Sequence, residues 1–410
     1  MLVKNILWAS FDRILVLGAG LIAYILVSRF LGPEMFGKIS FGLAISVLGI
    51  SLSQFGANHI IFNLASKRYP TALRMVKASS SIRLSVYLAF TAICSSLLFY
   101  WLGNAMDVLL ISVVILSQVF VGLDIYQYLL EGSFNSKKNA KANVISRLLA
   151  IFLRYLLIFF SAEVLWFVVP YFVAGSVSYV LKRKYAGIVR VRNNRLYSAY
   201  LITNGKYFAI AGVMAFLYTK ISEILLGTLL GFEESGIFGV GVTIGFAATF
   251  FPLSIGHALL SKGLAENDLS SKFVVSNFLM IVSFLPVIII LGLFGEYLVD
   301  QFLGKQYSVL GNYIWLFSLI GLCSVLSVIN NRYIGTFSNG SKYLIKKVIL
   351  AALIAPITSY FLIIRFGLAG AIYSLLLVEF LQLTIFNYPF RSGLLLKQHF
   401  RIFRVRKFTV

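Results

Sequence analysis

Charged residues are scarce in this sequence of 410 residues: Asp, Glu, Lys and Arg together make up 12% of it, and hydrophobic residues make up 60%. Soluble globular domains carry about 25% charged and about 45–50% apolar residues. The composition therefore excludes a cytosolic enzyme. At about 20 apolar residues for each bilayer crossing, the chain has room for on the order of a dozen membrane helices joined by short connectors.

Residues that form disulfides or bind metals are also few. The two cysteines, Cys94 and Cys323, lie inside apolar segments, and the three histidines form no pattern of zinc ligands. The signatures of nucleophilic, nucleotide-binding and dinucleotide-binding enzymes are absent as well. We therefore expect no enzyme activity, no cofactor and no metal centre.

The apolar runs, divided at polar clusters and at glycine and proline signals, predict an all-α polytopic membrane protein with about twelve transmembrane helices. These helices are expected near residues 5–31, 38–64, 83–101, 107–130, 143–161, 164–181, 206–230, 237–259, 273–294, 307–330, 344–364 and 368–389. The first run carries Asp12 and Arg13 and lacks a short leader pattern, so we expect it to be a membrane helix. Helices are the expected element because every backbone polar group must be satisfied inside the bilayer.

The placement of basic residues predicts the topology. The chain has 36 Lys and Arg against 14 Asp and Glu, a net charge of +22. If the N-terminus is cytoplasmic, 29 of the 36 basic residues fall on the cytoplasmic side: Lys4 and those in the connectors after even-numbered spans and in the C-terminal tail. Because cytoplasmic loops are enriched in Lys and Arg, we expect both termini in the cytoplasm. The basic loops are expected to contact anionic membrane lipids and not nucleic acid.

An internal repeat divides the chain into halves. The segment Leu31–Gly42 lies 199 positions before Leu230–Gly241, and Leu, Gly, Glu, Gly and Gly coincide in the two copies. Halves with equal numbers of spans predict two six-helix bundles related by pseudo-two-fold symmetry about the membrane normal. The expected parts are an N-terminal bundle (1–181), a basic cytoplasmic linker (182–205), a C-terminal bundle (206–389) and a basic cytoplasmic tail (390–410).

Charges inside membrane spans are costly and usually face a bundle interior or a water-filled cavity, so they are the candidate functional residues. Three basic candidates are Arg13, Arg154 and Lys220. Arg154 lies deep in its span, where a permanently charged, planar guanidinium suits phosphate oxygens. The alternative is a structural salt bridge from Arg154 to Asp124 or Glu379.

Three acidic candidates, Asp124, Glu223 and Glu379, are expected to serve coupling or gating. Glu223 follows Lys220 by three positions on one helical face, so the two form either a structural pair or a switch that frees Lys220 for a phosphate. Glu379 is a candidate proton or sodium site, with a structural hydrogen-bonding role as the alternative. A single helical face is expected to carry, with Asp124, the polar residues Ser117, Gln127, Tyr128 and Glu131.

Three stretches of sequence carry a family resemblance. Asn5–Phe62 contains the run Arg29–Gly37, Leu230–Glu233 echoes this run, and Phe366–Ala371 precedes the last expected span. With these motifs the chain resembles the polysaccharide-transport branch of the multidrug/oligosaccharidyl-lipid/polysaccharide exporter superfamily, and within it the O-antigen or O-unit flippases. The resemblance implies two bundles around a central cationic cavity. It also implies export of a polyprenyl-pyrophosphate-linked oligosaccharide across the bacterial cytoplasmic (inner) membrane by alternating access, in lipopolysaccharide or related polysaccharide biosynthesis.

Under this interpretation the residues that bind pyrophosphate are Arg13, Arg154 and Lys220, and those that couple transport to H+ or Na+, or gate it, are Asp124, Glu223 and Glu379. A polysaccharide polymerase or ligase is the expected protein partner. The alternative function is a cation-coupled small-molecule or multidrug antiporter of the same superfamily, whose cavity would favour acidic residues. A polymerase or ligase activity is disfavoured because the longest outer connector, about 295–306, is short.

Overall fold

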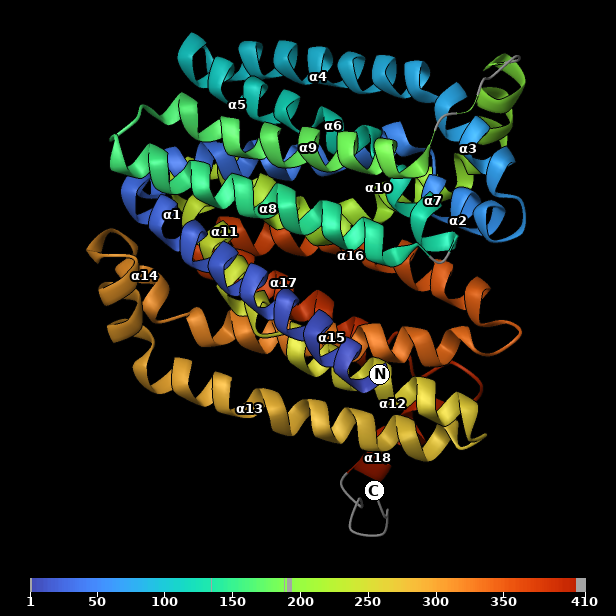
Figure 1. Cartoon of the computed structure of the whole chain (residues 1–410). Coiled ribbons are helices and arrows are strands. Elements are labelled where there is room, and N and C mark those ends of the chain that lie inside the picture. Colours follow the sequence, from blue (N-terminus) through green and yellow to red (C-terminus); the bar gives the residue numbers. More distant parts are fainter. Residues whose placement is uncertain (1, 134, 188, 190–193, 403–410) are drawn as a thin grey trace. The chain divides into compact units, whose positions relative to one another are not determined.

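The structure is a computed structural model that describes the chain apart from residues 1, 134, 188, 190–193 and 403–410, and that describes only the backbone at residues 2–17, 59, 194 and 195. All regular secondary structure in the described residues is helical, as the sequence predicts (Figure 1). The chain divides into two compact units, Met1–Phe216 and Leu217–Val410.

The first unit contains ten helical elements and most of an eleventh. They are α1 (Leu2–Gln54), α2 (Ala57–Lys67), α3 (Tyr69–Ala78), α4 (Ser80–Leu102), α5 (Ala105–Ser117), α6 (Val119–Leu123), α7 (Tyr126–Gly132), α8 (Ser136–Phe159), the 3-10 helix η1 (Val164–Val168), α9 (Val169–Ala186) and α10 (Asn194–Leu229). The division between the units falls inside α10. Helices α9 and α10 both extend into residues 182–205, and the division of the chain into bundles, linker and tail remains a prediction.

The second unit continues from α10 through nine further elements. They are α11 (Phe232–Ala247), α12 (Phe250–Ala265), α13 (Leu269–Phe302), the 3-10 helix η2 (Lys305–Tyr307), α14 (Ser308–Gly311), α15 (Ile314–Gly335), α16 (Gly340–Phe366), α17 (Leu368–Leu383) and α18 (Leu394–Ile402). Helix α18 is short and amphipathic and follows the last apolar helix of the chain.

Nine helical segments in the described part of the chain are long and apolar enough to cross a membrane, and the bent pair α11 and α12 makes ten. Three local features separate this number from the twelve expected spans. Helix α1 joins two expected spans across Gly32, α11 and α12 are bent by 43°, and α17 has only 16 residues. The polytopic all-α membrane fold is confirmed, and the exact number of twelve remains a prediction.

The two copies of the repeat share an unusual backbone conformation. Gly32 has φ 76° and ψ 165°, and Gly231 has φ 109° and ψ 173°. This region is open almost only to glycine. A second pair keeps helices close: a Cβ on Gly42 would lie 2.8 Å from a side chain of α5, and one on Gly241 would lie 2.3 Å from a side chain of α15. Glycines 199 positions apart thus have the same roles in both units.

Aromatic side chains fill the centre of each unit. In the first unit the ring centroids of Tyr126 and Tyr179 lie 5.6 Å apart, and the fully buried Tyr87 donates a hydrogen bond to the Ile115 carbonyl at 2.8 Å. In the second unit Phe273 stacks with its partner ring in α15 at a centroid distance of 4.2 Å. In the first unit, Tyr126 and Tyr179 lie within electrostatic range of the buried Arg83.

Candidate functional site

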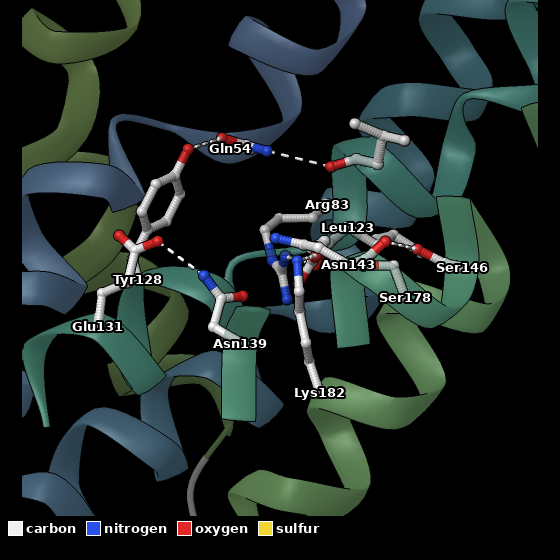
Figure 2. A network of polar contacts seen from close by, with 12 residues as sticks. Gln54, Arg83, Leu123, Tyr128, Glu131, Asn139, Asn143, Ser146, Ser178 and Lys182 are labelled. Carbon is white, nitrogen blue, oxygen red and sulfur yellow. Dashed lines mark hydrogen bonds and ion pairs between the residues drawn. The ribbon is translucent and has the colours of Figure 1, made fainter. Parts of the chain in front are cut away.

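The expected span near 107–130 is a broken helix, and this break places the polar residues of the first unit. Helix α5 ends at Ser117, and α6 and α7 meet at Asp124, whose φ of −81° and ψ of 77° are not helical. The single polar face predicted for this span is therefore wrong, because each break redirects the residues that follow it. Tyr128 instead donates from its hydroxyl to Gln54 Oε1 in α1 at 3.2 Å, and Glu131 accepts from Asn139 of α8 at 2.7 Å (Figure 2).

Asp124 itself is buried and pairs with Lys182 of α9. The Lys182 ammonium donates to Asp124 Oδ2, and the residues are 2% and 6% exposed. The fully buried Arg83 of α4 lies within electrostatic range of the same carboxylate. Asp124 also precedes the first turn of α7, where the helix dipole favours negative charge. Two cations and one anion are thus enclosed at this junction.

The break exposes backbone carbonyls, which must find partners in a membrane interior. Side chains of neighbouring helices supply them. In α1, Ser53 Oγ donates to Gly122 O at 3.3 Å and Gln54 Nε2 donates to Val121 O at 3.1 Å. Arg83 donates from one guanidinium nitrogen to Leu123 O and from the other to the carbonyl of Val76 in α3. Helices α1, α4 and α9 therefore converge on the α6–α7 junction (Figure 2).

Lys220 and Glu223, both in α10, form the pair that their spacing predicts, with Nζ and Oε2 separated by 2.8 Å. The Lys220 side chain is 31% exposed, whereas that of Glu223 is 4% exposed. The Glu223 backbone carbonyl accepts a hydrogen bond from Ser235 of α11 at 3.2 Å, which ties this turn of α10 to the next helix. The buried carboxylate thus anchors a lysine whose side chain is partly exposed.

Arg154 of α8 is partly buried and lies over an aromatic ring. Its guanidinium carbon is 4.8 Å from the ring centroid of Tyr171 in α9, a cation–π distance. The alternative salt bridge to Asp124 is not formed, because Asp124 pairs with Lys182, and no ion pair of Arg154 occurs among the described side chains. The contact with Tyr171 holds the guanidinium without neutralising its charge. The side chain of Arg13 lies outside the part of the chain that the structure describes.

In the second unit, Glu379 of α17 is 6% exposed and is hydrogen-bonded with Ser324 of α15. Lys347 of α16 is 2% exposed and lies within electrostatic range of this carboxylate. The Lys347 ammonium donates to the amide oxygens of Asn331, at 2.7 Å, and Asn387, at 3.0 Å. The buried acid and the buried base are therefore neighbours, but the described residues show no ion pair between them.

Besides Lys38 of α1, which pairs with Glu34 and Asp107, three buried cations are absent from the predicted site: Arg83, Lys182 and Lys347. The predicted topology counts all three among the cytoplasmic basic residues, because Arg83 and Lys347 lie at or near the start of an expected span and Lys182 directly follows one. A periodic signal was present for Lys182: it shares a buried face of α9 with Gly175 and Ser178, at spacings of four and three residues. Such a run of small and polar residues is typical of a helix face packed against other helices in a membrane.

The sequence of residues 2–260 matches a family described as polysaccharide biosynthesis protein. The chain belongs to this family. No curated protein sequence matches the chain. The family match agrees with the resemblance to the polysaccharide branch of the exporter superfamily, and solved structures of that superfamily share the fold.

Three solved structures illustrate this likeness. The lipid II flippase MurJ, in an inward closed conformation, has a TM-score of 0.74 and 10% identity over 98% of this chain and 94% of that chain. An inward-facing multidrug resistance MATE family transporter of the MOP superfamily has a TM-score of 0.70 and 11% identity, with 96% of each chain covered. A MOP superfamily transporter from Pyrococcus furiosus has a TM-score of 0.59 and 12% identity over 98% and 96%. The chain is thus a multi-pass membrane protein with a transporter fold.

The candidate residues therefore offer charge held inside a transporter fold. In the described part of the chain no three His, Cys, Asp or Glu side chains are close enough to hold a metal ion. Asp124 and Arg154 lie in the first unit, and Lys220, Glu223 and Glu379 lie in the second. Such groups can bind ions or anionic substrate groups, and their pairing can differ between conformations.

Proposed function

We propose that the chain is a flippase that moves a polyprenyl-pyrophosphate-linked oligosaccharide, an O-antigen or related repeat unit, across the cytoplasmic membrane by alternating access. The observation that carries the proposal is the match of residues 2–260 to polysaccharide biosynthesis proteins, in a chain with a multi-pass transporter fold. In this role the chain moves its substrate and makes or breaks no covalent bond.

The pyrophosphate is the physical obstacle, because it must cross a region of low dielectric constant where unpaired charge is costly. We assign its binding to Arg13, Arg154 and Lys220. The geometry of Lys220 supports this role: its ammonium is held by the buried Glu223, and about a third of the Lys220 side chain is exposed. Arg154 supports it in another way, since its contact with Tyr171 leaves its positive charge uncompensated.

We assign coupling or gating to Asp124, Glu223 and Glu379, driven by H+ or Na+. In this scheme protonation or ion binding at Glu223 releases Lys220 to the substrate phosphate, since the carboxylate and the ammonium are in contact at 2.8 Å. Glu379 contributes a second buried carboxylate in the same unit. A change of charge at Asp124 alters its contact with Lys182 of α9, whereas a change of charge at Glu223 alters a contact within α10.

The same proposal places the protein in the bacterial cytoplasmic (inner) membrane with both termini in the cytoplasm. The excess of basic residues in the even-numbered connectors supports this orientation. Anionic lipids then contact the basic loops, and a polysaccharide polymerase or ligase receives the exported unit at the outer surface.

The test measures lipid-linked oligosaccharide in each leaflet, in cells with and without the gene and in variants at matched expression. We expect loss of the gene to raise the pool in the cytoplasmic leaflet. Lys220→Ala and Arg154→Ala should each reduce export by about tenfold or more, because a charge-assisted contact to phosphate contributes about 1.5–3 kcal/mol.

Lys262→Ala is the matched control. Like Lys220, Lys262 has an acidic partner in sequence, here Glu266, four positions later. This pair is exposed and its atoms are 3.9 Å apart, so it is weak. Export by the Lys262→Ala variant should therefore be unchanged. Normal export in both test variants would refute the phosphate-binding assignment. An unchanged leaflet distribution on loss of the gene, together with altered drug sensitivity, would instead assign the chain to the small-molecule antiporters.

A further inference from the structure

The α6–α7 junction is a break that no proline causes. Residues 105–132 contain no proline, and a continuous helix would satisfy its own carbonyls. The break is instead maintained by side chains that reach it from α1 and α4, and by Lys182 of α9, which holds Asp124. The backbone conformation at the junction depends on side chains of α1, α4 and α9. It can therefore change when one of these contacts breaks.

Asp124 has two cationic neighbours and bonds directly to one. Lys182 occupies Oδ2, while Oδ1 is buried without a hydrogen-bond partner among the described residues. Arg83 offers the matching donor. Its Nε is also buried and has no hydrogen-bond partner among the described residues, and its guanidinium lies within electrostatic range of Asp124. An acceptor and a donor of opposite charge are thus left unused at one junction.

A buried ion pair is an expensive way to hold helices together, since an apolar pair of similar size is often as stable or more stable. This junction nevertheless retains three charged side chains, those of Arg83, Asp124 and Lys182. Charge at a helix junction becomes useful when the pairing has to change.

We infer that Asp124 exchanges between Lys182 and Arg83 during the transport cycle, and that the α6–α7 junction is the hinge that this exchange operates. Asp124, Lys182 and Arg83 are positioning residues, which set the angle between α6 and α7. The inference goes beyond the proposed function in assigning roles to Arg83 and Lys182, and it rests on that function only for its transport readout.

The exchange has a structural consequence for α9. When Asp124 turns to Arg83, the C-terminal end of α9, which carries Lys182, loses its only described ion pair. The same end of α9 is tied to α3, because Tyr69 donates from its hydroxyl to Ala186 O at 2.7 Å, and α3 is in turn held by Arg83 through Val76 O at 3.0 Å. The exchange of Asp124 therefore changes how α3 and α4 are linked to the C-terminal end of α9. The chain continues from this end toward α10.

A double variant tests whether the pair is more than a structural brace. Asp124→Leu combined with Lys182→Met replaces the ion pair by apolar side chains of similar volume. We expect this variant to fold, with a melting temperature near that of the unmodified protein, yet to lose transport by about tenfold or more. Transport within about twofold of normal would overturn the inference, because the pair would then only hold the fold.

The matched control removes a neighbouring polar contact of the same helix. Ser178, one turn before Lys182 in α9, donates to Asn143 Oδ1 of α8 at 3.1 Å (Figure 2). Asn143→Leu combined with Ser178→Ala should retain normal transport. Equal losses in the control and the test variant would show that any polar contact of α9 matters and would also overturn the assignment.

A tether tests the hinge in folded protein without removing the charges. With Cys94 and Cys323 replaced by serine, Glu131→Cys and Asn139→Cys can be joined by a short bifunctional thiol reagent, which links α7 to α8 across an existing 2.7 Å contact. We expect the tether to stop transport and reductive cleavage to restore it. The control tether joins Thr358→Cys and Ser374→Cys, whose native side chains touch at 2.9 Å in the second unit, and should be harmless. Full activity of the α7–α8 tethered protein would exclude a hinge here.

Amide exchange separates failure of this inference from failure of the proposed function. Hydrogen–deuterium exchange of residues 119–132 in purified protein needs no substrate. Asp124→Asn should accelerate it by about tenfold or more relative to the Asn143→Leu, Ser178→Ala control, because the junction loses its ionic partner. Equal exchange rates would refute the hinge even if the chain proves to be a flippase.

Discussion

At the scale of single residues, the backbone at Gly231 offers a clean test of the repeat. Its φ of 109° and ψ of 173° suit glycine, and a Cβ added there would meet nothing within 4 Å. Gly231→Ala therefore adds backbone strain without a clash, and we expect it to destabilise the protein by about 1–3 kcal/mol. The measurement is the melting temperature of purified protein in detergent.

The control for this prediction is Gly20→Ala in α1. Gly20 lies inside a helix and also has open space around its Cβ position, so alanine should leave the melting temperature unchanged or raise it. If both alanine variants melt alike, the conformation at Gly231 imposes no strain, and the shared backbone of the two repeat copies has no energetic basis.

The residue scale also shows what could be read from the sequence. The Lys220–Glu223 pair follows from helical spacing alone, and the structure confirms it. Arg83 and Lys182 could not be assigned in the same way, because a charge near the end of an apolar run is equally consistent with an aqueous loop. Only the packing of α4 and α9 against the α6–α7 junction decides that these two side chains are buried.

At the scale of elements, the docking of α18 depends on one histidine. His399 Nε2 lies 3.2 Å from Asn330 Nδ2 of α15, and its ring meets Tyr388 edge to face at 5.8 Å. Burial lowers the pKa of His399 to about 4. Since the pKa in the docked state lies below the ordinary value of about 6.5, the contribution of the neutral histidine to docking is fully present above pH 6.5 and is lost as the pH falls toward 4.

This dependence is measurable as exchange of the α18 backbone amides, corrected for intrinsic rates. We expect protection to decrease steadily between pH 6.5 and pH 4, and His399→Gln to remove the pH dependence because glutamine does not titrate. Constant protection over the range would show that the histidine is not held neutral by docking.

The elements also mark the limit of sequence-based prediction. The apolar runs of the sequence locate the helices, because a helix that crosses the lipid bilayer needs an apolar surface. The breaks at Gln118 and Asp124 were missed, since no proline causes them and the partners that stabilise the junction at Asp124 lie 40 or more positions away in the sequence. The bend between α11 and α12 escaped notice for the same reason, as composition within a run does not reveal its direction.

At the scale of the whole molecule, the uneven distribution of basic residues predicts the orientation of the chain in the membrane. Labelling the two ends of a single helix tests this orientation. Helix α8 has the exposed Lys137 at one end and the exposed Glu163 beyond the other. In protein lacking Cys94 and Cys323, a membrane-impermeant maleimide added to intact cells should label Glu163→Cys. It should label Lys137→Cys only after permeabilisation, because the basic end is expected in the cytoplasm.

The second unit supplies an independent pair, Lys342 and Arg365, at the two ends of α16. If the repeat axis runs along the membrane normal, α16 has the same orientation as α8, so Arg365→Cys should be labelled from outside and Lys342→Cys should not. Opposite patterns in the two units would mean an inverted repeat and would undermine the parallel arrangement. A reversed pattern in both units would keep the parallel repeat but place the basic face outside, which would contradict the proposed orientation for export from the cytoplasm.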